Sequence, residues 1–218
     1  MKRIGIVFGV FAFFLAAQPA FAAMATAVIK GTAEGSAVAG AATFTETKDG
    51  LDVEVNVSNV PPGKHGFHIH EKGDCSDMGK GAGGHYNPDG VMHGLVTKDG
   101  FTHAHAGDFG NIEVAADGTG VLKFSIAGLT LTGEKYNVAG KAVILHEKED
   151  DFGQPTGNAG GRIGCGIITL ADMPKAADAA VNKTTDEAAQ EMPKATGTLM
   201  EKAKEINDDM MGTMPETK

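Results

Sequence analysis

Residues 51–58, LDVEVNVS, alternate strictly between apolar and polar side chains. Successive side chains of a β-strand point to opposite faces, so this alternation predicts a strand with one face in a core and the other in solvent. The turn-forming stretches KDG at 48–50 and NVPPG at 59–63 bound this strand on both sides. A helix would distribute the same residues around its whole circumference, so the segment favours a sheet.

The rest of the chain repeats this pattern of short strands separated by turns. Strands are predicted within residues 27–57, at 65–71 (HGFHIHE), in a hairpin at 110–126 with its turn at ADG, at 140–147 (GKAVILHE) and at 163–170 (IGCGIITL). No helical segment separates them, which excludes the crossover connections of a parallel sheet. The predicted fold class is therefore all-β, an antiparallel Greek-key flattened barrel or sandwich.

Two long segments interrupt the short turns. The first runs from Lys72 to about Ala106 and is rich in Gly, His and Asp, and the second runs from Glu147 to Arg162. Long loops without secondary structure inside a compact domain are usually functional. We therefore expect two long functional loops on the barrel.

The first 22 residues have the order of a secretory signal peptide. Lys2 and Arg3 precede an apolar run at 4–17, and Ala20-Phe21-Ala22 forms a small-residue cleavage site. The alternative is an uncleaved anchor, but the apolar run is short for a membrane span. We expect a signal peptide at 1–22, export to the periplasm or the cell exterior, and no stable membrane span in the mature chain. The folded domain is predicted at 23–170.

The composition changes after Leu170. Residues 171–218 are rich in Ala, Lys, Glu, Asp and Met and poor in β-branched and aromatic side chains, so they are predicted to form a mobile C-terminal extension. The stretch LMEKAKEINDDMM at 199–211 could form a short helix that docks on a partner or a membrane, and the sequence does not identify that partner. The methionines of this extension could also bind Cu(I), because thioethers suit that ion.

Export changes the expected net charge of the mature chain and the expected redox state of its two cysteines. Removal of Lys2 and Arg3 leaves 17 basic against 28 acidic residues, a formal charge of −11, with no basic patch. Binding to nucleic acid is therefore not expected. Cys75 and Cys165 are predicted to pair as one disulfide, because two cysteines in an oxidising compartment most simply pair. The alternative is two free buried thiols.

Eight histidines lie between positions 65 and 146, and their spacing is the strongest functional pattern in the chain. In GFHIHE, strand alternation places His68 and His70 on the face opposite Phe67 and Ile69. One face then looks like a core and the other like a pair of ligands. Histidines at these spacings, interleaved with Gly and Asp, predict a metal-binding function.

Chemistry suggests two ligand sets. His146 ends another predicted strand and can join His68 and His70 if the two strands are neighbours. Imidazoles with solvent access suit a redox copper. Three imidazoles and a carboxylate form the closed ligand shell of a structural zinc. The loop offers such a set in His85, His93, His105 and Asp108. One histidine could serve both metals, since its ring carries two nitrogens.

The pattern resembles the copper/zinc superoxide dismutase family, and within it the secreted bacterial, periplasmic kind. The resemblance covers roughly residues 27–170 and is carried by the motifs GFHIHEKGDC, GGHYNP, HAGD followed by FGN, LHEKEDDFG and GNAGGRIGCG. It implies a β-barrel, copper and zinc as cofactors, and dismutation of the superoxide anion to O₂ and H₂O₂. A homodimer is a candidate assembly.

The resemblance also implies a role for each site residue. Copper would be bound by His68, His70, His85 and His146, and zinc by His85, His93, His105 and Asp108. His85 would bridge the two metals and accept a proton during catalysis, and Arg162 would hold the anionic substrate. Asp150, rather than Asp151, would join the two sites by hydrogen bonds to a ligand histidine of each. The Cys75–Cys165 bridge would help to place Arg162.

Two features of the chain depart from the expected pattern. The loop FGQPTGNAGG at 152–161 contains no lysine, so attraction of superoxide would fall to one or more of Lys64, Lys72, Lys80 and Lys148. His103 lies two residues before His105 and is expected to be a solvated loop residue, because the HxxD spacing favours His105 as the zinc ligand.

Two alternative functions remain open at this point. One is a periplasmic copper- and zinc-binding buffer or delivery module without turnover, whose ligands would look identical. Such a module would need neither a substrate cation such as Arg162 nor a coupling carboxylate such as Asp150. The other is a scaffold whose C-terminal extension binds a partner.

Overall fold

The computed structural model of the chain describes residues 22–171. The predicted signal peptide, apart from Ala22, and the predicted C-terminal extension, apart from Ala171, lie outside this range, as does the helix predicted at 199–211. Within the described part, no helix combines the length and the apolar character that crossing a membrane requires.

Strands form nearly all the regular structure of the described part. They are β1 (Met24–Gly31), β2 (Ala39–Glu46), β3 (Gly50–Ser58), β4 (Gly63–His70), β5 (Asp108–Val114), β6 (Gly120–Ala127), β7 (Ala142–His146), β8 (Arg162–Ile167) and β9 (Thr169–Leu170). Two short helices, η1 (Lys80–Ala82) and α1 (Val96–Asp99), lie in the long connection between β4 and β5.

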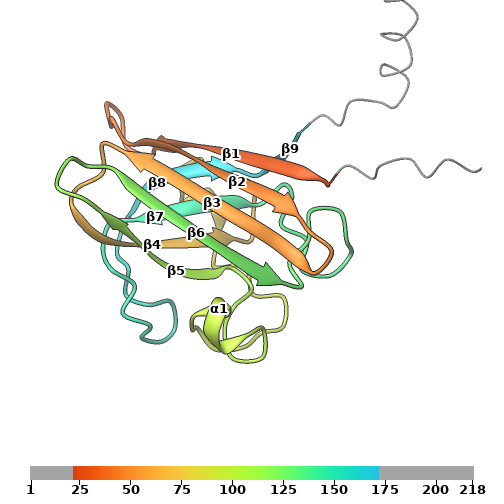
Figure 1. The fold of residues 1–218 in the computed structure, drawn as a ribbon. Coiled ribbons are helices and arrows are strands. Elements are labelled where there is room, and N and C mark those ends of the chain that lie inside the picture. Colours follow the sequence, from red (N-terminus) through yellow and green to blue (C-terminus); the bar gives the residue numbers. More distant parts are fainter. Residues whose placement is uncertain (1–21, 172–218) are drawn as a thin grey trace, which may run out of the picture. The chain divides into compact units, whose positions relative to one another are not determined.

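Eight of the strands close into an antiparallel barrel (Figure 1). Their order is β2-β3-β6-β5-β4-β7-β8-β1, and β1 pairs with β2 to close the ring. The strands β4, β5 and β6 are neighbours in both sequence and space, while β3 lies beyond β6, which is the Greek-key arrangement. The all-β antiparallel class predicted from the sequence is confirmed.

Alternating apolar side chains fill the barrel. In β3 the side chains of Leu51, Val53, Val55 and Val57 are buried, and the polar residues between them are exposed. The strand predicted at 51–58 is therefore confirmed, with β3 beginning one residue earlier. In β1 the same alternation buries Ala25, Ala27 and Ile29.

The hairpin predicted at 110–126 is present, but its two strands diverge directly after the turn. The only paired residues of β5 and β6 are Val114 and Gly120. Beyond them β6 pairs with β3 from Val57↔Gly120 to Gly50↔Ala127, and β5 pairs with β4. The barrel thus opens between these two strands, because each bonds mainly to its other neighbour.

Strand β4 carries the feature on which the site depends. Phe67 and Ile69 belong to the barrel core, whereas His68 and His70 point to the outer side. These two histidines are nevertheless only 0% and 1% exposed, because loops cover them. The predicted division of this strand into a core face and a histidine face is confirmed.

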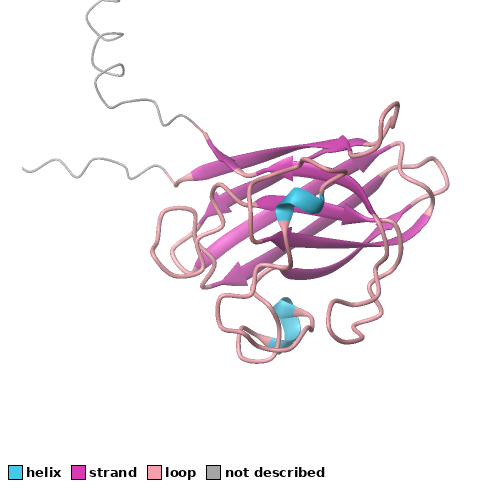
Figure 2. Cartoon of the chain, turned by 180° about the vertical axis from the view of Figure 1, so that it is seen from behind, coloured by secondary structure: helices cyan, strands magenta, loops and turns pink. Residues whose placement is uncertain are grey.

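The covering loops are residues 71–107, between β4 and β5, and residues 147–161, between β7 and β8. Figure 2 shows them on the outside of the barrel, with both short helices in the first loop. The disulfide between Cys75 and Cys165, whose Cα atoms are 5.8 Å apart, ties this loop to β8, which confirms the predicted pairing. A small apolar cluster under the loop adds to the attachment and consists of Ala82, Ala142, Ile144 and Cys165.

Candidate metal centre

Two groups of four side chains, and a third group of three (His68, His93 and Asp150), bring their potential ligand atoms within 4.8 Å of one another. The first group is His68, His70, His85 and His146, and the second is His85, His93, His105 and Asp108. The structure thus brings together all seven residues that the sequence suggested as ligands, in the two suggested sets. His85 is the member that both groups share. All seven are buried, from 0% exposed for His68 to 7% for His85.

Neighbouring strands explain why distant residues meet. Strand β4 pairs with β7, so His68 and His70 lie beside the strand that ends at His146. The first loop returns along β4, where His70 and His85 form an isolated β-bridge. Asp108 begins β5 and pairs with His68. Sequence separations of up to 78 residues are therefore bridged by strand pairing alone.

The rings of His70 and His146 face each other through nitrogens that carry no hydrogen. His70 Nδ1 lies 2.9 Å from the carbonyl oxygen of Gly83, and His146 Nδ1 lies 3.5 Å from that of Gly160. A carbonyl oxygen only accepts, so each Nδ1 is the protonated nitrogen of a neutral ring. The two Nε2 atoms then present lone pairs to each other at 3.3 Å. A cation between such lone pairs would remove their repulsion.

His68 is oriented by a carboxylate. Its Nε2 donates to Asp150 Oδ2 at 2.8 Å, which leaves Nδ1 as the acceptor nitrogen. His68 Nδ1 is buried and has no hydrogen-bond partner among the described residues. An unsatisfied buried polar atom costs about 1–3 kcal/mol. A bound metal ion would satisfy the lone pair of His68 Nδ1, so this nitrogen is a candidate metal ligand.

Burial keeps three imidazoles of the first group, those of His70, His85 and His146, neutral. It lowers the pKa of His70 to about 2, that of His146 to about 3 and that of His85 to about 4. For His85 a hydrogen bond to Asp108 opposes this effect without overcoming it. Metal ligation requires deprotonated imidazole, so these rings are ready to bind a metal at neutral pH.

The second group converges on Asp108. The Nδ1 atoms of His85, His93 and His105 lie 2.8, 2.8 and 3.1 Å from its carboxylate oxygens. Burial alone would raise the pKa of Asp108, but interactions with the three rings hold it well below its usual range. An ionised carboxylate ringed by three imidazole nitrogens is the donor set that suits zinc.

The surroundings of His93, in the second group, favour a positive charge on or beside its ring. Its Nδ1 lies close to Asp108 but outside hydrogen-bond geometry, and its Nε2 lies 2.9 Å from Asp150 Oδ1. Burial alone lowers the pKa of His93, yet the two carboxylates raise it to about 9. A proton supplies the charge in the metal-free protein, and a metal cation on Nδ1 can supply it instead. The residues therefore fit a zinc ion.

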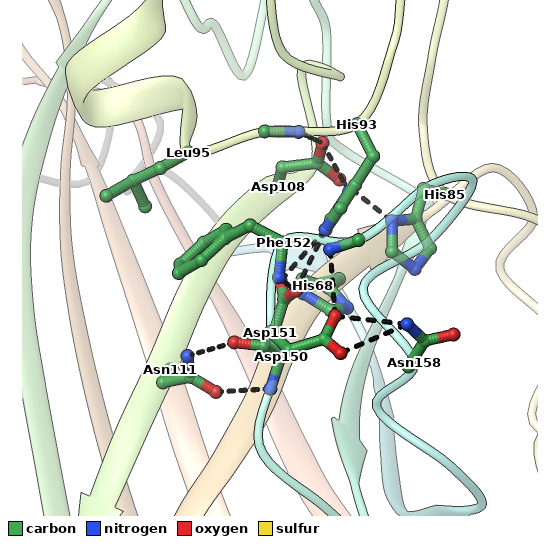
Figure 3. Close-up of polar contacts among 12 residues, drawn as sticks. His68, His85, His93, Leu95, Asp108, Asn111, Asp150, Asp151, Phe152 and Asn158 are labelled. Carbon is green, nitrogen blue, oxygen red and sulfur yellow. Dashed lines mark hydrogen bonds and ion pairs between the residues drawn. The ribbon is translucent and has the colours of Figure 1, made fainter.

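Asp150 links the two groups. Its carboxylate accepts hydrogen bonds from His68 of the first group and His93 of the second (Figure 3). Asp151, the alternative considered from the sequence, is exposed and bonds instead to Asn158 and to the backbone of Gly153.

Three residues near this link were missed by sequence reasoning. Asn111 clamps the backbone of Asp150, accepting from its N–H at 2.7 Å and donating to its carbonyl at 2.9 Å. Asn111 lies in the FGN motif, which was the signal that could have found it. Phe152 and Gln154 contact His93, and no pattern in the sequence singled them out.

Arg162 lies beside the first group, close enough for its charge to add to the effect of burial in lowering the pKa values of His70 and His146. Its guanidinium donates to the carbonyl oxygens of Gly79 at 2.5 Å and Gly83 at 2.6 Å. Gly83 also accepts from His70, so the cation is one carbonyl away from a potential copper ligand. Arg162 lines an open hollow of about 320 Å³ together with Met78, Lys80, Gly160 and Gly161.

The remaining candidates are placed as follows. His103 is exposed, bonds to Thr102 and belongs to neither group. His65 is buried outside both groups, between the carbonyl oxygens of His146 and Pro61. Of the four lysines suggested to attract an anion, Lys80 lines the hollow, and Lys64 is paired with Glu149 at 3.0 Å.

Comparison with known proteins agrees with this geometry. The model of the family described as copper/zinc superoxide dismutase matches residues 38–168. An extracellular Cu-Zn superoxide dismutase of Drosophila melanogaster is 43% identical over 142 residues, which cover 61% of this chain and 76% of that protein. One of Caenorhabditis elegans is 42% identical over 132 residues, covering 57% of this chain and 58% of the nematode protein.

A solved structure gives the same picture for the fold. The crystal structure of the clock protein EA4 is 34% identical and superposes with a TM-score of 0.61, over 72% of this chain and all of that one. The family match extends over more than half of the chain and contains all seven residues of the two groups together with both cysteines. The chain therefore belongs to the copper/zinc superoxide dismutase family.

Proposed function

We propose that this chain dismutes superoxide, converting two superoxide anions and two protons into O₂ and H₂O₂. Copper would be held by His68, His70, His85 and His146, and zinc by His85, His93, His105 and Asp108. When bound, the copper supplies the one-electron redox chemistry, and the zinc supplies a fixed positive charge on the shared ring. The observation that carries the proposal is His85, a single buried imidazole that belongs to both ligand groups.

The chain's own residues divide the remaining work. Arg162 holds the substrate anion beside the first group, where no carboxylate among the described residues neutralises its charge. His85 offers one ring nitrogen to each group, so its Nε2 can hold a proton on its way to the product while Nδ1 stays on the side of Asp108. His85 is 7% exposed, so most of its surface is shielded from bulk water.

Asp150 has a positioning role in this proposal. By accepting from Nε2 of His68 and of His93, it selects the tautomer in which both Nδ1 atoms are free to bind metal. Asn111 holds the backbone of Asp150 in turn. A metal buffer without turnover would need the ligands but not the anion-binding Arg162, which is why we favour the enzyme over that alternative.

One experiment tests the proposal directly. The purified chain is loaded with copper and zinc, its metal content is measured, and the decay of superoxide is followed in the same preparation. The expected result is one copper and one zinc for each chain and a rate that scales with copper content. Full metal content without superoxide decay would favour the buffer or delivery module.

We also propose export and a domain organisation that match the sequence expectations. Residues 1–22 would be removed, 23–170 would form the enzyme domain, and 171–218 would be an appended segment. The extracellular relatives support export. The bacterial, periplasmic kind stays a prediction. Mass spectrometry of the secreted protein would identify the first residue of the mature chain.

A homodimer through the outer face of β1, β8 and β9 is our proposal for the assembly. Val28, Ile167 and Leu170 are 61%, 41% and 45% exposed on this face and border an open hollow of about 690 Å³. Apolar side chains gathered on one exposed face favour association with a second copy. Sedimentation should give a dimer for the wild type and a monomer for Val28→Lys, and a monomeric wild type would refute the dimer.

A further inference from the structure

The five residues Asp150–Gln154 surround the candidate zinc ligand His93 on three sides. The Asp150 carboxylate accepts from the ring nitrogen Nε2 at 2.9 Å. The ring of Phe152 stacks on the imidazole, with the ring planes 19° apart and the centroids separated by 6.3 Å. Gln154 contacts the backbone of His93 rather than its ring. Figure 3 shows His93 between Asp108 on one side and Asp150 and Phe152 on the other.

Gln154 makes two hydrogen bonds to this one residue. Its Oε1 accepts from the backbone N–H of His93 at 3.0 Å, and its Nε2 donates to the backbone carbonyl of His93 at 2.9 Å. The orientation of the amide follows from its partners, because a backbone N–H only donates and a carbonyl only accepts. The side chain therefore satisfies both polar groups of the His93 main chain.

The next residue is held from the opposite direction. The backbone N–H of Gly94 donates to Asp108 Oδ2 at 3.0 Å, the same oxygen that lies 2.8 Å from His93 Nδ1. The His93–Gly94 backbone is thus fixed by Gln154 on one side and by Asp108 on the other. Loss of the Gln154 bonds would leave the His93–Gly94 backbone held by the Gly94 bond to Asp108 alone, so that the His93 Nδ1 atom could shift relative to Asp108.

We infer that Gln154 is the positioning residue of His93, and that this clamp controls how fast zinc leaves the second ligand group. The inference rests on the proposed function, which it deepens by naming a residue outside the ligand set. Gln154 lies on the exposed side of the loop, so an opening that frees His93 can start at the surface without disturbing the buried rings. Partners of metal-ligating histidines typically contribute about 10- to 100-fold to metal affinity.

The test compares four full-length proteins loaded with copper and zinc. They are the wild type, Gln154→Ala, Gln154→Met, which keeps the length of the side chain but not its amide, and the matched control Thr156→Ala at an exposed position of the same loop. The release of zinc into a chromophoric chelator is timed for each. The absorption spectrum of Co(II) bound in place of zinc reports the geometry of the ligands, and thermal unfolding of the metal-free proteins reports the fold.

We expect both Gln154 variants to release zinc about tenfold faster than the wild type or more, and to change the Co(II) spectrum. Thr156→Ala should match the wild type in both measurements, and the metal-free melting temperatures should agree among all four. Equal zinc release from the wild type and Gln154→Met would overturn the inference alone. A wild type that takes up no zinc would overturn the proposed zinc site, and the inference with it.

Discussion

At the scale of single residues, Arg162 is placed by backbone carbonyls and not by an ion pair. Both of its hydrogen-bond partners, Gly79 and Gly83, belong to the loop between β4 and β5. No carboxylate lies within ion-pair distance of it in residues 22–171. Its positive charge is therefore free to attract an anion, which is what the proposed substrate requires.

Replacing Arg162 should separate substrate binding from metal binding. We expect Arg162→Ala to slow superoxide decay by about tenfold or more, because the cation beside the first group is lost. Copper content should stay the same, because the guanidinium touches no potential ligand atom directly. Stopped-flow kinetics with metal analysis of the same sample measures both. A variant that loses its copper would show that Arg162 supports the site and not the substrate.

Lys80 and Lys64 allow a matched comparison of charge. Lys80 lines the hollow with Arg162, whereas Lys64 is paired with Glu149 at an exposed site. Each substitution by Ala changes the net charge by the same amount. We expect Lys80→Ala to lower the bimolecular rate by about two- to fivefold at low salt and to weaken its salt dependence. Lys64→Ala should change neither, and equal effects of both would argue against local attraction by Lys80.

The roles of single residues could be predicted from the sequence where the side-chain type and the two-residue alternation of a strand point to the same role. Strand alternation separated His68 and His70 from Phe67 and Ile69, and the structure places them as expected. Gln154 could not be found this way. It is an exposed loop residue whose importance depends on a backbone 61 positions away, and neither composition nor period encodes that contact.

At the scale of elements, the loop between β4 and β5 is anchored to the barrel by one covalent bond and one small apolar cluster. Cys75 of the loop is joined to Cys165 of β8 across 90 residues of sequence. Cys165 lies three residues beyond Arg162 on the same strand. The loop also supplies the carbonyls of Gly79 and Gly83 that hold Arg162, so the disulfide and the arginine form one connected unit.

Removal of the disulfide should therefore affect both stability and catalysis. We expect Cys75→Ser combined with Cys165→Ser to lower the free energy of unfolding by about 4 kcal/mol, from the entropy of a loop of this length. The rate per bound copper should also fall, because Arg162 loses its fixed partners. Urea denaturation and superoxide decay measure the two effects. A reduced stability with an unchanged rate per copper would separate the bridge from the placement of Arg162.

The positions of the strands were predictable to within about two residues, with two exceptions. The single strand predicted at 163–170 is divided at Ile168 into β8 and β9. The second exception concerns two strands that share a turn but pair mainly with other strands. The alternation in β5 and β6 predicted a hairpin, and the turn between them is correct. Their separation after Val114 and Gly120 depends on competition from β4 and β3. Such competition is a property of the closed barrel, and no local stretch of sequence contains it.

At the scale of the whole molecule, the metal-free protein buries several titratable groups whose pKa values move in opposite directions. His70, His85 and His146 have pKa values lowered by burial to between about 2 and 4 from an ordinary 6.5, and His93 has a pKa raised to about 9 by Asp108 and Asp150 against the effect of burial. These shifts make the stability of the metal-free fold depend on pH on both sides of neutrality.

The sign of each contribution follows from proton uptake on unfolding. The three histidines with lowered pKa take up protons on unfolding below pH 6.5, so they lower the free energy of unfolding progressively as the pH falls from 6.5 towards their folded pKa values of about 4, 3 and 2. His93 releases a proton on unfolding between pH 6.5 and about 9, so its contribution is lost as the pH rises. We expect the free energy of unfolding of the metal-free protein to peak near pH 6.5.

Urea denaturation of the metal-free protein between pH 5 and 9 measures this profile. Each of the three histidines contributes a slope of at most about 1.4 kcal/mol per pH unit on the acid side. The metal-loaded protein should show a flatter profile above pH 6, because the bound cations replace the protons at these rings. A metal-free stability that rises steadily from pH 6.5 to 5 would contradict the assignment of neutral buried histidines.

The carbonyl oxygen of Gly83 accepts from both His70 Nδ1 and Arg162 Nη2. Gly83 has φ +75°, and a Cβ there would lie 2.3 Å from the Glu71 carboxylate, so no other residue fits without displacement. One carbonyl oxygen thus holds both His70, a proposed copper ligand, and Arg162, the proposed binding residue for the superoxide anion. A change that displaces the Gly83 carbonyl would therefore disturb both the orientation of the His70 ring and the placement of the Arg162 guanidinium.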